Sequence, residues 1–194
     1  MKFRIILASA SPRRKELLEQ VGVEFEIIPA VGEEIITDSR PQQAVLDLSA
    51  QKAAEVAAKV QEDAIILGAD TVVAFGDKVL GKPKDEADAE QMLSLLSGKT
   101  HSVYTGVTII VKQSGESRSY SFYEETKVTM YTLSEQQILS YIRTGEPMDK
   151  AGSYGIQGRG AVFIEKIQGD YNNVVGLPIA RVVRKIEEVC GFSV

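Results

Sequence analysis

The sequence has few of the residues that form cross-links or bind soft metals. It contains one cysteine, Cys190, one histidine, His101, and no tryptophan. A single cysteine excludes an internal disulfide and fits a reducing compartment. Cys190 lies one helical turn beyond Ile186, where we expect a small core residue. A single histidine excludes a metal site built on two histidines, and its place at the start of a predicted strand favours a structural or surface role. In an enzyme, carboxylates would then be the expected general bases.

Long apolar segments are also missing. No run approaches the length needed to cross a membrane, and the N-terminus lacks the apolar core of a signal peptide. The net charge of −5 disfavours a general binder of nucleic acid or of acidic membranes. With 44% hydrophobic residues among 194, the chain can form one globular domain over residues 1–194, which we expect in the cytoplasm.

Hydrophobic patterning predicts an α/β fold with a mixed sheet, because βα units flank an antiparallel middle section. The predicted strands cover residues 3–8, 23–28, 64–75 with an interruption, 78–80, 101–111, 117–132 and 161–167. The predicted helices cover residues 12–21, 41–60, 85–96, 135–144 and 178–190. Ser11 is expected to cap the first helix, and Ser134 with Gln137 forms a capping box for the fourth. The loop 145–160 has five glycines and little pattern, which is typical of a functional loop.

Two segments have the spacing of a phosphate-binding P-loop without its chemistry. The stretch 76–83 ends in Pro83, which has neither the hydroxyl that binds magnesium nor a backbone N–H for a phosphate. The stretch 98–100 ends correctly, but Leu93 stands where the first glycine should be. Neither segment is a P-loop.

Four cations stand at positions from which several loops could reach one anion. The stretch ASASPRR at residues 8–14 joins a strand to a helix, and places Arg13 next to Arg14. Lys52 stands in a helix of small apolar residues, and Lys82 in the turn LGKP. Each lysine alone is typical of a solvated surface. Together the four side chains indicate a site for a polyphosphate.

Carboxylates complete this pattern. Asp70 follows the apolar run 65–69, near the end of a predicted buried strand, where ligands of α/β sheets bind and where an aspartate can hold a metal or activate water. A turn aspartate beside Thr71 explains the residue equally well. Glu33 and Glu34 follow the second strand, a pair that alone is typical of solvated surface. Cations, metal-binding carboxylates and a base together favour hydrolysis of a phosphoanhydride.

Five segments, in this order, resemble motifs of the Maf family: LASASPRRKELL, LGADTVV, LGKP, LSGKTHSVYTGV and EPMDKAGSYGIQGRGAVFIEKIQGDYNNVVGLPI. The resemblance runs from about residue 4 to residue 180, and its last motif is long and specific. Members of this family are nucleoside triphosphate pyrophosphatases, also described as septum formation inhibitors.

The resemblance implies a fold like that of the inosine triphosphate pyrophosphatases, an elongated mixed sheet flanked by helices with a cleft between two lobes. It implies a divalent cation, Mg²⁺ or Mn²⁺, a nucleoside triphosphate substrate and a homodimer. Asp70 matches the proton acceptor, and Glu34 and Asp70 the metal-binding positions. The positions that match phosphate-binding residues are Ser9, Ser11, Arg13, Arg14, Lys52 and Lys82.

The family has branches that differ in the base they accept. The branch acting on dTTP and UTP carries SPRR, ADT and GIQG, and this sequence matches it at Arg13, Thr71 and Gln157. A side-chain amide such as that of Gln157 can both donate to and accept from the O4/N3 edge of a pyrimidine. Two alternatives stay open: a 7-methyl-GTP pyrophosphatase of the same family, and a nucleotide-binding regulator of cell division that needs no catalysis.

Overall fold

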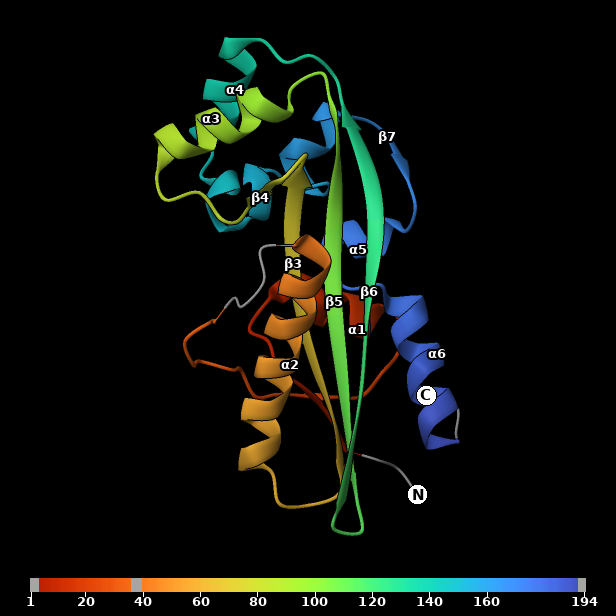
Figure 1. Ribbon diagram of the computed structural model, residues 1–194. Coiled ribbons are helices and arrows are strands. Elements are labelled where there is room, and N and C mark those ends of the chain that lie inside the picture. The colour runs from red at the N-terminus through yellow and green to blue at the C-terminus, as the bar shows by residue number, and fades with distance from the viewer. Residues whose placement is uncertain (1–3, 36–39, 192–194) are drawn as a thin grey trace.

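The computed structural model describes residues 4–35 and 40–191 of the chain. A seven-stranded mixed sheet forms its centre, and helices lie against both faces (Figure 1). Three long strands run through most of the height of the molecule. Around one end of them the elements α1, α2 and α6 form a lower lobe, and around the other end α3, α4 and β4 form an upper lobe. The predicted elongated mixed α/β sheet is confirmed; that residues 1–194 form one domain stays a prediction.

The strands are β1 (Arg4–Leu7), β2 (Glu26–Ile27), β3 (Ala64–Phe75), β4 (Lys78–Leu80), β5 (Thr100–Gln113), β6 (Glu116–Met130) and β7 (Ile164–Gln168). The α-helices are α1 (Pro12–Gln20), α2 (Pro41–Lys59), α3 (Glu86–Leu96), α4 (Glu135–Ile142), α5 (Tyr171–Val175) and α6 (Ile179–Cys190). Three short 3-10 helices follow α4: η1 (Glu146–Asp149), η2 (Ala151–Ser153) and η3 (Gly158–Phe163). Within residues 4–35 and 40–191, no helix is both long and apolar enough to cross a membrane.

The order of the sheet leaves part of β3 without a neighbour on one side. The strands follow one another as β2-β1-β3-β5-β6-β7, and β4 adds to β3 on the same edge as β1. β1 pairs with β3 only up to Leu67, and β4 begins its pairing at Val73. Between them, residues 68–72 pair with β5 alone among the described strands. We call residues 68–72 the open edge of β3.

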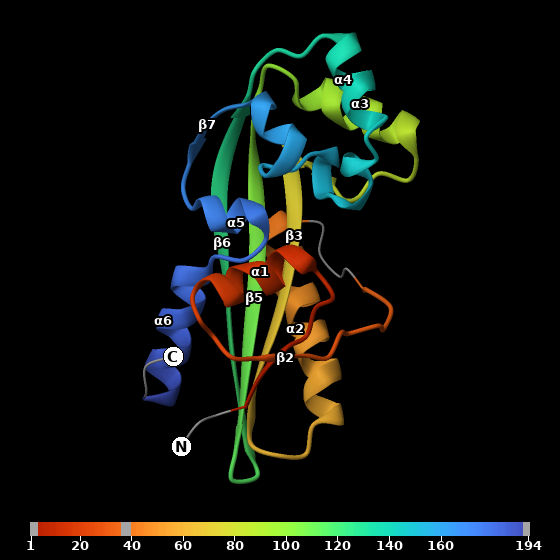
Figure 2. The same ribbon diagram turned by 180° about the vertical axis from the view of Figure 1, so that it is seen from behind.

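The two faces of the sheet are covered by different helices. Side chains alternate along a strand, so that Ile66 faces α2 while Ile65 and Leu67 face the opposite side. On that opposite side α1, α5 and α6 bury one apolar cluster in the lower lobe, and α3 and α4 bury another in the upper lobe (Figure 2). Cys190, at the end of α6, is partly buried against the lower cluster, as expected.

Two glycines let α2 lie directly on the backbone of the sheet. A Cβ on Gly68 would come within 2.3 Å of the carbonyl oxygen of Ser49, and one on Gly106 within 2.1 Å of that of Val45. Real Cβ atoms do not approach backbone so closely, so a side chain at either position would push α2 outward. The position of α2 fixes the residues on its inner face, among them Lys52.

Several predicted elements differ in extent from those observed. The interruption expected within residues 64–75 is wrong, because β3 continues through Gly68 with its pairing to β5 intact. The strand expected at 23–28 is reduced to Glu26–Ile27, and residues 161–163 belong to η3 rather than to β7. Residue 3 of the first predicted strand lies outside the described residues. The short helix α5 was not predicted, since five residues show no periodicity.

Two local predictions are confirmed. The side chains of Ser134 and Gln137 form the expected capping box at the start of α4. His101 is buried, and its Nε2 lies 2.7 Å from the hydroxyl of Tyr154. Burial lowers the pKa of His101 to about 4, so the imidazole is neutral at physiological pH. Of the two predicted roles, structural or surface, this burial fits the structural one.

The close approach of α2 gives a testable prediction. Gly106→Ala inserts a methyl group against the backbone of α2, and overpacking of this kind typically costs about 1–3 kcal/mol, so we expect Tm to fall by roughly 3–10 °C. Gly81→Ala is the matched control, because a Cβ there meets open space. Thermal unfolding followed by circular dichroism gives the Tm of the wild type and of the two variants. If Gly106→Ala melts with the wild type, α2 does not rest on the sheet as described.

Candidate active site

The candidate site is organised around the open edge of β3. Asp70 and Thr71 are adjacent there, so their side chains point to opposite faces of the sheet. Asp70 shares the α2 face with Gly68, whereas Thr71 meets residues that come from α1 and α5. Asp70 was predicted near the end of its own strand; it lies within β3, and the strand that ends beside it is β1. Asp70 and Thr71 therefore bring partners from both faces of the sheet to adjacent positions on β3.

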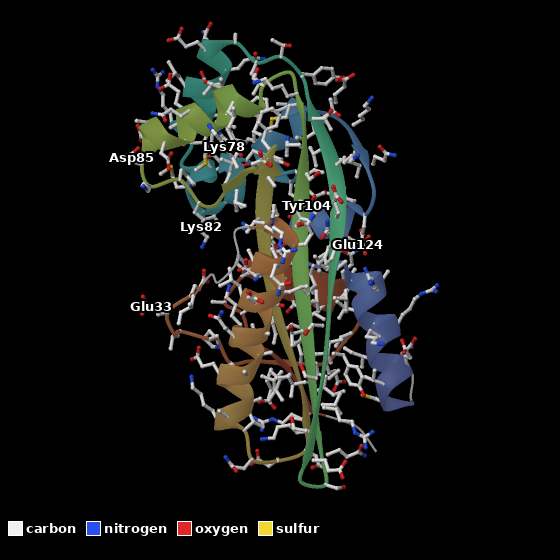
Figure 3. The ribbon with its side chains drawn as sticks, in the orientation of Figure 1. Glu33, Lys78, Lys82, Asp85, Tyr104 and Glu124 are labelled. Carbon is white, nitrogen blue, oxygen red and sulfur yellow. The ribbon has the colours of Figure 1, made fainter. Side chains whose placement is uncertain are left out.

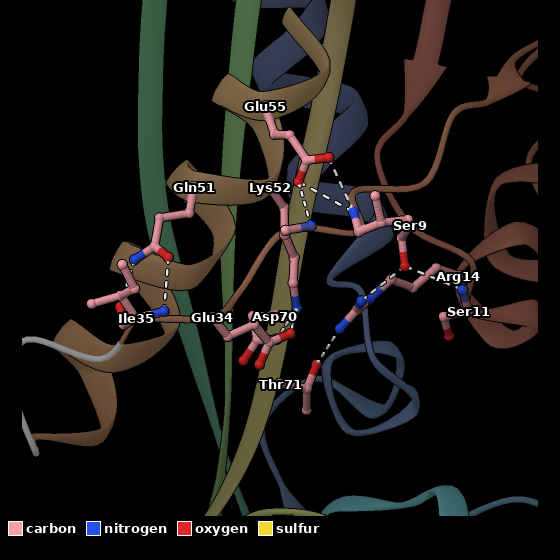
Figure 4. A network of polar contacts seen from close by, with 12 residues as sticks. Ser9, Ser11, Arg14, Glu34, Ile35, Gln51, Lys52, Glu55, Asp70 and Thr71 are labelled. Atoms are coloured by element: carbon pink, nitrogen blue, oxygen red, sulfur yellow. Dashed lines mark hydrogen bonds and ion pairs between the residues drawn. The ribbon is translucent and has the colours of Figure 1, made fainter.

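On the α2 face, Lys52 joins two carboxylates. Its Nζ lies 2.5 Å from Oδ1 of Asp70 and 2.8 Å from Oε1 of Glu34 (Figure 4). The side chains of Asp70 and Lys52 are only 12% and 17% exposed, while that of Glu34 is 55% exposed. The structure thus brings Glu34, Lys52 and Asp70 together, and Lys52 is not simple solvated surface.

The segment that carries Glu34 is held against α2 by two side chains that sequence reasoning missed. Gln51 donates to the carbonyl of Ile35 at 2.6 Å and accepts from its N–H at 3.0 Å. Glu55 accepts hydrogen bonds from the backbone N–H groups of residues 31 and 32. Both anchors lie one turn from Lys52 or less, so α2 positions the lysine and its partner Glu34 together (Figure 4).

The ionisation of Glu55 fits this anchoring role. A hydrogen bond from Lys59, followed by bonds from the backbone N–H groups of Gly32 and Val31, lowers the pKa of Glu55 to about 2. The carboxylate is therefore charged at neutral pH. Its pairing with Lys59, four residues on, is visible as a helical spacing in the sequence. Its contact with a loop 24 residues earlier carries no such signal.

On the opposite face, Arg14 enters the site with most of its side chain buried. Nε donates to the carbonyl of Gly176 at 2.9 Å, Nη1 to Oγ of Ser9 at 3.1 Å and Nη2 to Oγ1 of Thr71 at 3.1 Å. Burial lowers the pKa of Arg14, and the nearby charge of Asp70 acts against this. A guanidinium has five N–H donors; three are used, so two remain for a ligand. In the described part of the chain no carboxylate forms an ion pair with Arg14.

The two neighbouring arginines point to different partners. Nη1 of Arg13 lies 2.9 Å from Oδ2 of Asp149, in the upper lobe. Ser11 is the N-cap residue of α1, as predicted, but its side chain makes no capping bond; its backbone N–H donates to Oγ of Ser9 instead. Sequence reasoning missed Asp149, because an ion pair across 136 residues leaves no local pattern.

Two further predicted site residues belong to the upper lobe. Lys82 lies in the loop between β4 and α3, and its side chain is exposed. It projects from the lower edge of the upper lobe, and Glu33 lies below it on the same side of the molecule (Figure 3). Gln157 precedes η3 and is also exposed. No described contact joins either residue to Asp70 or Arg14, so the structure does not bring these two into the group at the open edge.

A hollow of about 440 Å³ lies between the lobes on the α2 face. It is bounded by the first turn of α2 at Pro41 and by the β3–β4 turn at Asp77, and Tyr104 and Lys127 line it from the sheet. Asp70, Lys52 and Arg14 are not part of its lining. The hollow and the polar group at the open edge are thus separate features.

The carboxylates at the open edge fit a hard divalent cation. In residues 4–35 and 40–191, no three His, Cys, Asp or Glu side chains are grouped closely enough to hold a metal. Two carboxylates, those of Glu34 and Asp70, nevertheless converge on the single ammonium of Lys52. Mg²⁺ typically uses one or two protein carboxylates and takes its other ligands from phosphates and water. The donor set therefore suits such an ion when a phosphate ligand is present.

The chain is similar to proteins of one family over almost its whole length. Residues 4–189 match the family described as "Maf: Maf-like protein". A protein of Agathobacter rectalis named "dTTP/UTP pyrophosphatase" is 57% identical, over 96% of this chain and 97% of the relative. Proteins of the same name from Bacillus cereus and Bacillus cytotoxicus are 55% and 54% identical, each over 95% of both chains.

Among solved structures, one titled "Structure of a HAM1 protein from Coxiella burnetii" superposes with a TM-score of 0.43 at 15% identity, over 66% of this chain and 73% of that one. This likeness is too distant to carry an argument. The family match and the identities do carry one: the chain belongs to the Maf family.

Proposed function

We propose that this protein is a nucleoside triphosphate pyrophosphatase that hydrolyses dTTP and UTP to the nucleoside monophosphate and pyrophosphate. One observation carries the proposal: at the open edge of β3 a carboxylate, Asp70, lies beside the ammonium of Lys52 and near the buried guanidinium of Arg14. The names of relatives that are 54–57% identical over 95–96% of the chain support the same substrates.

The triphosphate would bind to donors that the fold leaves unused. Arg14 keeps two N–H groups, and Lys52 has a third N–H beyond its bonds to Glu34 and Asp70. Ser9 and Ser11 line the loop that leads to these groups. We assign Arg13 and Lys82 to the outer phosphates, Arg13 after release from Asp149. Charge-assisted bonds of this kind are about twice as strong as neutral ones.

Glu34 and Asp70 would hold the divalent cation, Mg²⁺ or Mn²⁺. When bound, such an ion supplies positive charge to phosphate oxygens as their negative charge increases. With the two carboxylates engaged by the cation, the ammonium of Lys52 would be free to turn from them toward a phosphate oxygen.

Asp70 would act as the general base. A water molecule forms a new bond to phosphorus, the bond between the α- and β-phosphates breaks, and the water proton passes to the Asp70 carboxylate. Pyrophosphate leaves with the electron pair of the broken bond. The bond from Lys52 holds the Asp70 carboxylate in place on the α2 face of the open edge.

We assign the choice of a pyrimidine base to Gln157. Of the other two positions that match the pyrimidine branch, Arg13 acts on the phosphates and Thr71 on the orientation of Arg14 through their hydrogen bond. The exposed amide of Gln157 is available to a ligand. A homodimer and a location in the cytoplasm stay predictions, and nucleic acid is not proposed as a partner.

A substrate panel tests the proposal. The purified protein is incubated with UTP, dTTP, CTP, GTP and 7-methyl-GTP in Mg²⁺ or Mn²⁺, and the nucleotide product and pyrophosphate are quantified by chromatography. We expect UTP and dTTP to give monophosphate and pyrophosphate in equal amounts. Release of diphosphate and orthophosphate would contradict the proposed reaction. A preference for 7-methyl-GTP, or binding with no turnover, would favour one of the alternatives.

The role of Asp70 can be tested by removing its charge alone. Asp70→Asn keeps the size of the side chain but loses its basicity, so we expect pyrophosphate release to fall by roughly 10²–10⁴-fold while triphosphate still binds. Asp77→Asn, an exposed aspartate in the β3–β4 turn, is the control and should keep wild-type turnover. Turnover is measured with UTP, and binding by calorimetry. Full activity in Asp70→Asn would show that another group takes the proton.

The role of Gln157 can be tested through base selectivity. Gln157→Ala removes an exposed side chain with no described partner, so the fold should be unaffected. Loss of one base-reading contact typically costs about 1–3 kcal/mol, and we expect kcat/KM for UTP and dTTP to fall by about tenfold or more. The rate with GTP should change much less. Equal losses for all substrates would assign Gln157 to the triphosphate or to the loop itself.

A further inference from the structure

The loop 155–160, which carries Gln157, is held at its second half by one partly exposed carboxylate. Glu146, the first residue of η1, accepts hydrogen bonds from the backbone N–H of Arg159 at 3.0 Å and of Gly160 at 3.1 Å. Burial raises the pKa of Glu146, but these two bonds and one from a tyrosine outweigh it, and the pKa is lowered overall. The carboxylate therefore stays charged and keeps accepting both bonds at neutral pH.

The first half of the same loop is tied through Tyr141. Its hydroxyl donates to Oε1 of Glu146 at 2.9 Å and accepts from the backbone N–H of Gly155 at 3.1 Å. The two ends of the loop thus meet at this pair. They also pack closely, since a Cβ on Gly160 would lie 2.5 Å from the carbonyl oxygen of Gly155 and 2.7 Å from the tyrosine hydroxyl.

Between the two tied ends, the side chain of Gln157 stands free. The residue is exposed, and no hydrogen bond to another described residue involves its amide. A side chain that recognises a base must be presented at a fixed place, because a displacement of about 1 Å is enough to lose such a contact. In this loop the fixed place comes from the backbone, and the backbone is held by Glu146 and Tyr141.

We propose that Glu146 is a positioning residue for base selection: with Tyr141 it holds the loop 155–160 so that Gln157 meets the pyrimidine edge. This inference rests on the proposed function. Glu146 lies in the upper lobe and has no described contact with Asp70, Lys52 or Arg14. Its loss should therefore change which base is accepted and leave proton transfer at Asp70 unaffected.

Glu146→Gln is the informative variant, because an amide keeps the size but turns an N–H₂ group toward backbone donors. We expect the ratio of kcat/KM for UTP over that for GTP to fall by about tenfold, through KM for UTP, with kcat at saturation close to wild type. Hydrogen exchange at the amides of Arg159 and Gly160 should become faster. Glu135→Gln, an exposed residue at the start of α4, carries the same charge change and should alter neither quantity.

A double variant separates positioning from general stability. If Glu146 acts through Gln157, adding Glu146→Gln to Gln157→Ala should reduce the UTP/GTP ratio no further. Full additivity overturns the inference, as does a single Glu146→Gln variant that keeps the wild-type ratio. Should Glu146→Gln fail to fold, Tyr141→Phe releases only the Gly155 end and is judged by the same ratio. A wild type with no pyrimidine preference defeats the proposed function itself, which the panel with wild-type protein shows first.

Discussion

The open edge of β3 is the constraint on which the site depends. A strand buried on both faces and paired on both sides offers a ligand no access, whereas residues 68–72 pair with a described strand on one side only. Because adjacent side chains of a strand point to opposite faces, Asp70 and Thr71 there collect partners from both sides of the sheet. The helix α2 brings Lys52 to one face, and the start of α1 brings Arg14 to the other. Because β1 ends opposite Leu67, it leaves this part of β3 accessible, and the site depends on that early end as well as on its charged residues.

The cations near this edge already have polar partners among the described residues. Lys52 is bound by Glu34 and Asp70, Arg13 by Asp149, and Arg14 by neutral oxygens only. A triphosphate therefore meets two cations, Lys52 and Arg13, that already share their charge with carboxylates. The buried Arg14 is different: its described hydrogen bonds go to neutral oxygens, and the nearby charge of Asp70 offsets only part of the cost of its burial. An anion that reaches it would offset more of this cost, which makes Arg14 the cation best suited to hold the ligand first.

Local sequence patterns were enough to place most of the helices and the capping box at Ser134. They were not enough for features that depend on a distant partner. Asp70 was expected at a strand end, and what lies beside it is the end of another strand, which no single segment can show. The pairing of Arg13 with Asp149, and the bonds of Glu146 to the loop 155–160, join residues that are remote or irregular. Periodicity carries no information about such contacts, although the glycine-rich composition did mark the loop.

The balance of charge at the open edge separates an enzyme from a protein that only binds nucleotides. Glu34 and Asp70 place two negative charges next to the two positive charges of Lys52 and Arg14. For a triphosphate alone, these carboxylates are a disadvantage, since like charges repel and the site would bind more tightly without them. They become useful when a divalent cation accompanies the phosphates, and when one of them must take a proton from water. A regulator that merely sensed a metal-bound nucleotide would need carboxylates for the metal but no general base, so a base at Asp70 argues for turnover.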